Sequence, residues 1–349
     1  MKRALVLALF VAACDPMGDF DIDLSGLEPG PIAGDRGAVT FALVDGCPGG
    51  NFLFGCDKTM PAFAVGARAR FVIGSASGSP SDEAKLAKAT FVVSDPRVAA
   101  VGRDAEGFVV LSALADGSAV IEVDDENGDV IDSISVDVER VVSLKGDMAT
   151  TVLEGARLGA SVIATGTSGR ALFAHGAVVA TLTGGIELDA DPSGFFMSSE
   201  QVVIRVGKLL PPDTNSETEP TESIARTRPA HIVWSTGAVS TDVSYTIVTR
   251  DDITSVKVSE LWHEPSAYKQ NLHADAKVGE KYVRGGPACD WRIVSGGGDG
   301  AALASGVGDD THSGFAFFDS ALVYGNGDMT VECRVNERVV GEMTVHLGP

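Results

Sequence analysis

The stretch that decides the fold begins with Gly117-Ser118-Ala119-Val120-Ile121-Glu122-Val123, continues through Asn127-Gly128, and ends with Ser133-Ile134-Ser135-Val136-Asp137-Val138. In the last run, apolar side chains take every second position, which is the period of a β-strand with one buried and one wet face. Asn-Gly is a preferred pair for a tight turn between antiparallel strands. The stretch therefore predicts a β-hairpin lying on a hydrophobic core.

A second motif lies just upstream, at Ser94-Asp95-Pro96-Arg97-Val98-Ala99. Together with 117–123 it resembles the bacterial immunoglobulin-like domain of the second group. That family's pattern is a Ser-Asp-Pro-x-Val-Ala turn followed by Gly-x-Ala-x-Ile-x-Val. The resemblance implies an immunoglobulin-like β-sandwich here and says almost nothing about function.

The rest of the chain from Gly37 onward shows the same short alternating segments and turn dipeptides, which are typical of all-β sandwiches. One short helix is predicted over 80–88, where Ser79 can cap the first turn and Pro80 fits its start. We therefore predict an all-β chain of tandem immunoglobulin-like β-sandwiches. Residues 211–229, rich in Pro, Thr and Glu, are expected to form a long loop.

Short repeats suggest how the chain divides. Similar tetrapeptides precede possible strands at Val65-Gly66-Ala67-Arg68, Glu154-Gly155-Ala156-Arg157 and Val278-Gly279-Glu280-Lys281. They predict three units of the size of an immunoglobulin-like sandwich. These units are residues 37–140, 141–251 and 252–349, of which the last contains a pair of cysteines.

The N-terminus carries an export signature. Lys2 and Arg3 precede an apolar run that ends in Val11-Ala12-Ala13-Cys14, and this run is too short to span a bilayer. The pattern resembles the lipobox of bacterial lipoproteins, which implies acylation of Cys14. By that resemblance residues 1–13 are a signal peptide and 14–36 a lipid-anchored, flexible tether. The protein is then expected in the bacterial cell envelope, anchored to a membrane on its extracytoplasmic side, periplasmic or surface-exposed.

Composition limits the partners. The chain has 349 residues, enough for two or three domains, and its 48 Asp and Glu against 27 Lys and Arg give a formal net charge of −21. Such a chain repels phosphate backbones, so no nucleic-acid partner is expected. The expected partners are a membrane through the lipid anchor, and an envelope protein or a glycan.

Four cysteines beyond Cys14 suit an oxidising compartment: Cys47, Cys56, Cys289 and Cys333. Three connectivities are possible, and proximity in sequence favours pairing within each half. Trp291 alternates with Cys289 on one predicted strand face, so the second bridge is expected to cross-link two sheets beside a buried tryptophan, resembling an immunoglobulin core. Asn326-Gly327 predicts a tight hairpin that leads into the Cys333 strand.

One acidic stretch has calcium-loop spacing. Asp189, Asp191 and Glu200 match the first, third and twelfth positions of an EF-hand loop. The flanking segments read as strands, however, and Pro192 is atypical in such a loop. We favour an acidic sandwich loop and predict neither metal nor cofactor, while Ca²⁺ binding stays open as the alternative.

No catalytic motif is present in the sequence, and the six histidines are scattered. His175 and His231 lie in apolar segments and are expected to be structural. The clearest candidate for binding is Phe52-Leu53-Phe54, inside the loop between Cys47 and Cys56. Exposed aromatic rings in a closed loop form a contact patch at little ordering cost, but we favour the alternative, in which the rings fold back and cap the core of the first unit.

These features predict a non-enzymatic, lipid-anchored cell-envelope protein that acts as a structural spacer or as an adhesion or interaction module. The alternative is a carbohydrate-binding or Ca²⁺-dependent binding lipoprotein of the same architecture. The lipobox, the family-like segment and the missing catalytic motif favour the first hypothesis.

Lipidation can be tested at its acceptor. Replacing Cys14 with serine removes the thiol to which lipid would be attached. We expect the Cys14→Ser chain to accumulate as an unlipidated precursor in the membrane fraction or to be released in soluble form. Mass spectrometry and membrane fractionation check this, and an unchanged mature mass with unchanged fractionation would contradict lipidation.

Overall fold

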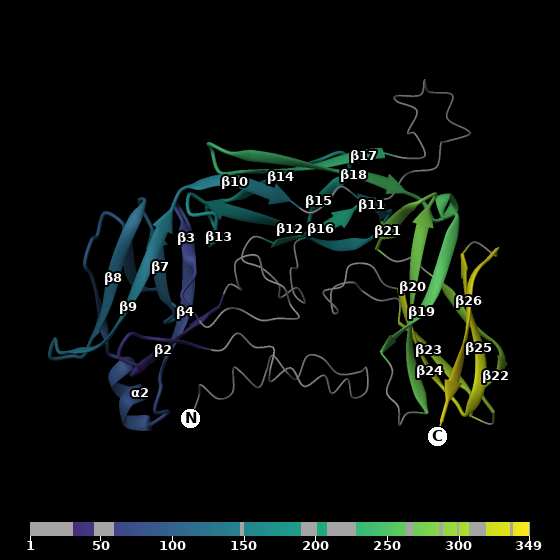
Figure 1. The fold of residues 1–349 in the computed structure, drawn as a ribbon, viewed down its shortest axis with the longest axis horizontal. Helices are drawn as coiled ribbons and strands as arrows, with labels where there is room; N and C mark the ends of the chain where they lie inside the picture. The colour runs from purple at the N-terminus through teal and green to yellow at the C-terminus, as the bar shows by residue number, and fades with distance from the viewer. Residues whose placement is uncertain are drawn as a thin grey trace.

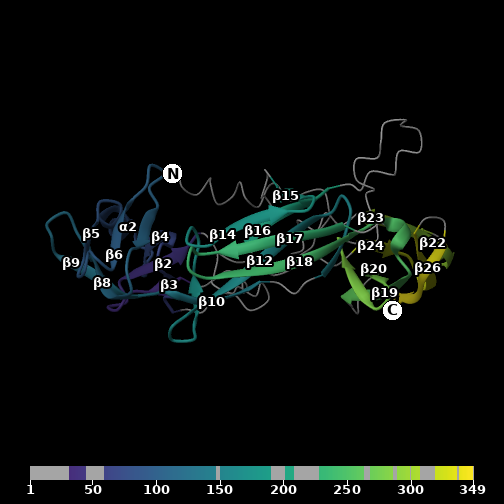
Figure 2. The ribbon, with the colours of Figure 1, turned by 90° about the horizontal axis from the view of Figure 1, so that it is seen from above.

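The computed structural model describes residues 31–44, 59–146, 150–189, 201–207, 228–262, 268–285, 289–298, 300–306, 319–335 and 338–348. Nearly all regular structure in these ranges is β-strand, which confirms the predicted all-β class. Figure 1 shows three β-sandwich bodies arranged as an arch, with the middle body across the top and the other two hanging from its ends. Seen from above in Figure 2, the three bodies lie in one line.

The first body contains two facing sheets. One has the order β1-β2-β4-β7-β6, and the other ends in β3-β9-β8-β5. Their bounds are β1 Ile32–Ala33, β2 Val39–Leu43, β3 Ala62–Ala64, β4 Arg68–Ser75, β5 Thr90–Val93, β6 Ala99–Arg103, β7 Val109–Ala113, β8 Gly117–Asp124 and β9 Val130–Glu139. Between the sheets, the ring of Phe71 meets those of Phe41 and Phe63 edge-on, at centroid distances of 6.4 and 6.3 Å.

The hairpin predicted from the opening stretch is confirmed as β8 and β9, with Ile121 and Ile134 as buried cross-strand partners. Its turn is wider than two residues, because Asp125 N–H donates to the carbonyl of Asp129 at 2.9 Å. The Asp125 carboxylate accepts from the N–H groups of Asn127 and Asp129 at 2.8 and 3.0 Å. Gly128 has a φ of 86°, which completes a three-residue turn with a bulge.

The β1–β2 turn and the start of β2 are held to the hairpin by Asp132, which is fully buried on β9. Its carboxylate accepts from the backbone N–H groups of Arg36, Ala38 and Val39 at 2.8, 2.7 and 2.7 Å, and from that of Ser133 at 2.8 Å. Burial alone raises the pKa of Asp132, but the four donors outweigh it and the pKa lies below its usual range.

The second body also has two sheets. One contains β10, β12, β13, β15 and β16, and the other contains β11, β14, β17 and β18. The bounds are β10 Val141–Gly146, β11 Thr150–Leu153, β12 Arg157–Gly166, β13 Ala171–Phe173, β14 Val179–Thr183, β15 Ile186–Leu188, β16 Gln201–Val206, β17 Arg228–Ser235 and β18 Ser240–Val248.

The third body faces a larger sheet against a three-stranded one with the order β22-β25-β26. The larger sheet has β19 Ser255–Trp262, β20 Lys269–Val278, β21 Lys281–Arg284, β23 Ala302–Gly306 and β24 Asp319–Tyr324. The smaller sheet has β22 Asp290–Gly296, β25 Gly327–Val335 and β26 Arg338–Leu347.

The predicted Cys289–Cys333 disulfide is confirmed, with a Cα–Cα distance of 5.1 Å. Its predicted position was wrong in one respect, because it does not join two sheets. β22 pairs antiparallel with β25, and Trp291 lies opposite Cys333 in that ladder. The bridge therefore links neighbouring chain segments of one sheet, and the tryptophan beside it is buried as expected.

The predicted hairpin at Asn326-Gly327 is also wrong. β24 pairs with β20 and β23, whereas β25 pairs with β22 and β26, so the chain crosses here from one sheet to the other. Asn326 N–H donates to the carbonyl of Gly297 at 3.0 Å, and Gly297 N–H donates to that of Asp328 at 2.9 Å. These bonds fix the crossing where a hairpin would have paired the strands directly.

The predicted helix is confirmed as α2, Pro80–Leu86, which ends two residues earlier than expected. The Ser79 hydroxyl accepts from Asp82 N–H at 3.2 Å, as a capping residue should. A short 3-10 helix, η2 at Arg250–Asp252, lies between the second and third bodies. Within the described ranges, none of the helices is long and apolar enough to cross a membrane.

We expect Asp132→Ala to lower the free energy of unfolding by roughly 3 kcal/mol, because it leaves the buried Val39 N–H and the part-buried Arg36 and Ala38 N–H groups without their acceptor. Urea denaturation at neutral pH measures this loss. Asp129→Ala, at the exposed hairpin turn, is the matched control and should cost well under 1 kcal/mol. Equal losses of unfolding free energy in both variants would show that Asp132 does not hold the β1–β2 turn and the start of β2.

Candidate functional sites: predicted residues and the two junctions

Several predicted site residues lie outside the described ranges. These are the lipidation residue Cys14, the cysteines Cys47 and Cys56, the aromatic segment 52–54, and the loop residues Asp191 and Glu200. Their predictions stay predictions. The structure does place Asp189, His175, His231 and the second cysteine pair.

Asp189 follows β15, and its side chain is only 2% exposed. Its carboxylate pairs with the guanidinium of Arg157 and lies 3.4 Å from that of Arg205. Ca²⁺ needs carboxylate oxygens as ligands, so an ion at this residue would compete with two cations already in place. Across the described ranges, no three acidic, histidine or cysteine side chains converge in a way that could hold a metal.

The outer face of the β14-β17-β18 sheet brings together one of the scattered histidines with a serine and an aspartate. His231 Nδ1 lies 3.2 Å from Asp242 Oδ1 and 3.3 Å from Ser244 Oγ. In a catalytic triad, the serine and the carboxylate contact opposite ring nitrogens, so that the imidazole can take the serine proton while the carboxylate orients the ring. Here the Asp242 and Ser244 oxygens both contact His231 Nδ1. A 180° flip of the imidazole ring would still leave both oxygens on the same side of the ring, so the cluster lacks the geometry of a triad.

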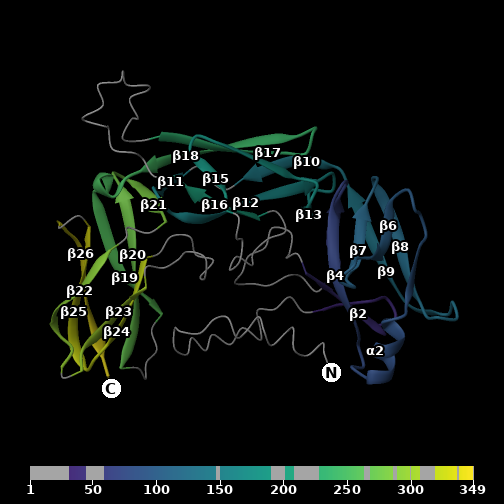
Figure 3. The same cartoon turned by 180° about the vertical axis from the view of Figure 1, so that it is seen from behind.

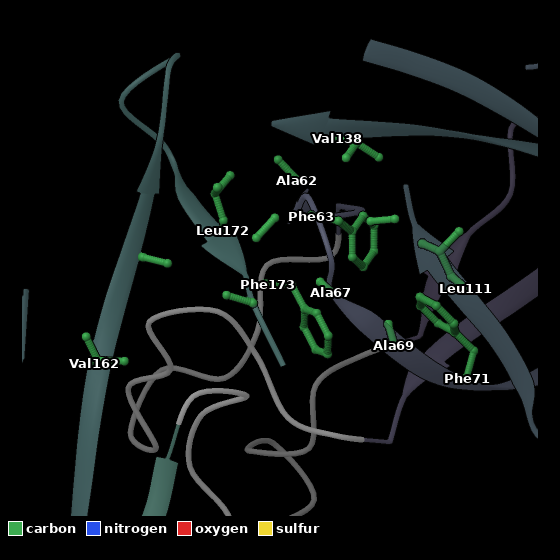
Figure 4. Packing of buried hydrophobic residues seen from close by; sticks show 14 of the residues in the cluster. Ala62, Phe63, Ala67, Ala69, Phe71, Leu111, Val138, Val162, Leu172 and Phe173 are labelled. Atoms are coloured by element: carbon green, nitrogen blue, oxygen red, sulfur yellow. The ribbon is translucent and has the colours of Figure 1, made fainter. Parts of the chain in front are cut away.

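The first junction, between the first and second bodies, is a continuous sheet. β3 pairs in parallel with β9 on one side and with β13 on the other. Phe63 and Phe173 are register partners across β3 and β13, both are fully buried, and their ring centroids are 5.6 Å apart. Figure 4 shows these two rings in the packed layer between the bodies.

The same junction also contains a polar cluster, formed by Glu139 and Asp137 of β9 with Ser168 and Arg170 of the β12–β13 turn. Glu139, the last residue of β9, is largely buried, and its carboxylate accepts from Ser168 N–H and Oγ at 2.9 and 2.8 Å. Arg170 donates to it at 2.8 Å and to Asp137 at 3.0 Å. These bonds, with the Ser168 backbone first and the Arg170 guanidinium next, lower the pKa of Glu139 to about 2. The Glu139 carboxylate of the first body thus binds the β12–β13 turn of the second body through hydrogen bonds and an ion pair.

The close approach of the Glu139 carboxylate to the end of β12 requires a glycine there. A Cβ atom on Gly166, the last residue of β12, would lie 2.3 Å from Glu139 Oε2 and 2.9 Å from the side chain of Leu172. Only a residue without a side chain allows the carboxylate to reach the turn.

The second junction repeats the arrangement between the second and third bodies. β11 pairs in parallel with both β18 and β21, so Val152 lies beside Arg284 of the third body. Arg284 is buried and donates to the carbonyl of Gly159 on β12 at 3.0 Å. Figure 3 shows β11 and β21 side by side from behind.

The connection between the bodies is short at the first junction. β9 ends at Glu139 and β10 begins at Val141, so Arg140 alone separates them. One buried hydrophobic cluster runs through the first two bodies, and a second runs from Leu153 into the third. The divisions predicted after residues 140 and 251 fall at these junctions, and as boundaries of separate domains they stay predictions.

Sequence reasoning missed the residues that matter at the junctions, namely Glu139, Arg170 and Arg284. The available signal was weak. Asp132, Ile134, Val136 and Val138 are the alternating buried positions of β9, so Glu139 should have faced water, and its burial comes from a turn about thirty residues later in the chain. No local pattern announces such a partner.

No family model matches the chain, and no curated protein matches it. Among solved structures, surface layer protein SbsC domains 4–9 aligns over 84% of this chain and 46% of that chain, at 14% identity and a TM-score of 0.29. An endo-fucoidan hydrolase from glycoside hydrolase family 107 covers 83% and 43%, at 12% and 0.24. Drosophila OTK extracellular domains 3–5 covers 83% and 95%, at 12% and 0.21.

This chain therefore spans less than half the length of the SbsC chain aligned with it.

Replacing Glu139 with glutamine should weaken the first junction. The lowered pKa means that the carboxylate stabilises the fold fully above about pH 4.5 and loses that effect as pH falls towards about 2. We expect Glu139→Gln to lose roughly 2 kcal/mol at pH 7 and much less at pH 3. Urea denaturation at both pH values, with exposed Glu106→Gln as control, measures the difference. A loss equal at both pH values would contradict a role for the ionised carboxylate.

Proposed function

We propose that this protein is a non-enzymatic, lipid-anchored protein of the bacterial cell envelope that acts as a rigid spacer. One observation carries the proposal. Backbone ladders run without interruption through both junctions, from β9 through β3 to β13 and from β18 through β11 to β21. An object of fixed shape suits the task of holding a surface at a set place relative to a membrane.

Rigidity at the first junction follows from what bending would break. Domains joined by exposed linkers normally move relative to one another. Here, bending would separate β3 from β13, expose the rings of Phe63 and Phe173 to water, and leave the Glu139 carboxylate without its donors. Each of these steps costs free energy, and they must occur together.

The envelope location is supported by the N-terminal pattern and by cysteine chemistry. Val11-Ala12-Ala13-Cys14 resembles a lipobox, and by that resemblance the residues after Cys14 would separate the lipid from the fold, whose first strand β1 begins at Ile32. A disulfide between Cys289 and Cys333 suits an extracytoplasmic, oxidising compartment. The partner that the protein would meet in this compartment is an envelope protein or a glycan. The net charge of −21 argues against nucleic acid.

Distance measurements between the outer bodies test the spacer function. Spin labels carried by genetically encoded amino acids, which leave the native cysteines untouched, can replace exposed Val92 on β5 and Val294 on β22. We expect pulsed electron paramagnetic resonance to give one narrow distribution of distances between the two labels. Its width should match that of a control pair within the first body, at Val72 and Val92.

Introducing Glu139→Gln into the labelled chain should broaden the distribution between the outer bodies and leave the control pair unchanged. A broad distribution in the chain with native Glu139, alongside a narrow control, would contradict a rigid spacer.

A further inference from the structure

The open edge of the second body is the strand β14, Val179-Ala180-Thr181-Leu182-Thr183. It ends the sheet β14-β17-β18-β11, and among the described residues its ladder partner is β17 alone. The five register pairs with β17 run without a bulge. An edge strand directs the N–H and C=O groups of alternate residues outward, where another strand can pair with them.

The other edges formed by the described strands are protected in ways that β14 is not: β1 has only two residues, and β10 and β26 carry charged side chains. β6, β15, β19 and β22 each carry at least one charged side chain. β5 is uncharged, but the Arg103 guanidinium lies 5.3 Å over Phe91 and donates to the carbonyl of Leu86. The ion pair of Lys88 and Glu126, at 2.9 Å, flanks the same strand. Charges at a sheet edge discourage pairing with another chain.

β23, Ala302–Gly306, is uncharged too, but it contains no β-branched or aromatic residue and is a weak strand former. β14 combines the absence of charge with β-branched residues at alternate positions. Val179, Thr181 and Thr183 are exposed on its outer face, and Val179 is 59% exposed. Ala180 and Leu182 pack against the core and fix which face is outward.

We propose that β14 is a self-association edge, which pairs antiparallel with β14 of a second copy of this chain. Centring the pair on Thr181 sets Val179 opposite Thr183 of the other copy and Ala180 opposite Leu182. The two Thr181 residues meet at the two-fold axis, and Thr–Thr is a favourable cross-strand pair. The pairing joins two nine-stranded sheets into one.

Charge disfavours the pairing of two copies at those edges whose strands carry ionised side chains. Two chains that each carry a net charge of −21 repel, and like charges directly opposite one another destabilise a ladder. When the β14 strands of two copies pair, neither strand brings a charged side chain into the ladder. The inference does not depend on the spacer function, because it concerns the edge alone.

Light scattering on the unlipidated full chain, Cys14→Ser, tests the pairing. With rising concentration we expect the mass to increase from 36.0 kDa towards twice that value. Adding Thr181→Lys sets two positive charges at the axis and should keep the chain at 36.0 kDa throughout. Val92→Lys on β5 is the matched control and should dimerise like the parent, and circular dichroism verifies that each variant is folded.

A second variant tests the geometry directly. Thr181→Cys, treated with a short bis-maleimide, should give a single covalent product of dimer mass, whereas Val92→Cys should give only the background of the parent chain. A parent that stays monomeric at every concentration would overturn the proposal. So would a dimer that survives Thr181→Lys, or equal cross-linking of both cysteine variants.

Discussion

The arch depends on the pairing of β3, a strand of three residues. All three residues are buried, and the strand receives β9 on one side and β13 on the other, both in parallel. Because Arg140 alone separates β9 from β10, the chain cannot place the second body freely. β3 converts that short connection into a sheet, and the Glu139 carboxylate then satisfies the turn that the sheet brings near it.

Local pattern was sufficient wherever neighbours in sequence are neighbours in space. The β8–β9 hairpin, the capped helix at Pro80 and the Cys289–Cys333 bridge all follow from residue types at short spacing or from pairing by proximity. Alternation also reports which face of a strand is buried. It does not report which sheet a strand joins, and so the disulfide was expected between sheets although it lies within one.

The remaining features rest on contacts that no local pattern encodes. Asn326-Gly327 has the chemistry of a hairpin, yet backbone bonds to Gly297 turn it into a crossing between sheets. The parallel pairings at both junctions join strands far apart in sequence, and Glu139 and Arg284 are buried by partners from another body. His231 likewise meets Asp242 and Ser244 only because β17 and β18 pair in one particular register.

The distribution of buried side chains also bears on how the molecule comes apart. One apolar cluster extends from Ile32 to Ile247 and includes both of the first two bodies, whereas a separate cluster fills the third. Cooperative units of unfolding tend to follow such contiguous cores. Three bodies that look alike in outline should therefore melt as two units, one formed by the first two bodies together and the other by the third, which holds the disulfide.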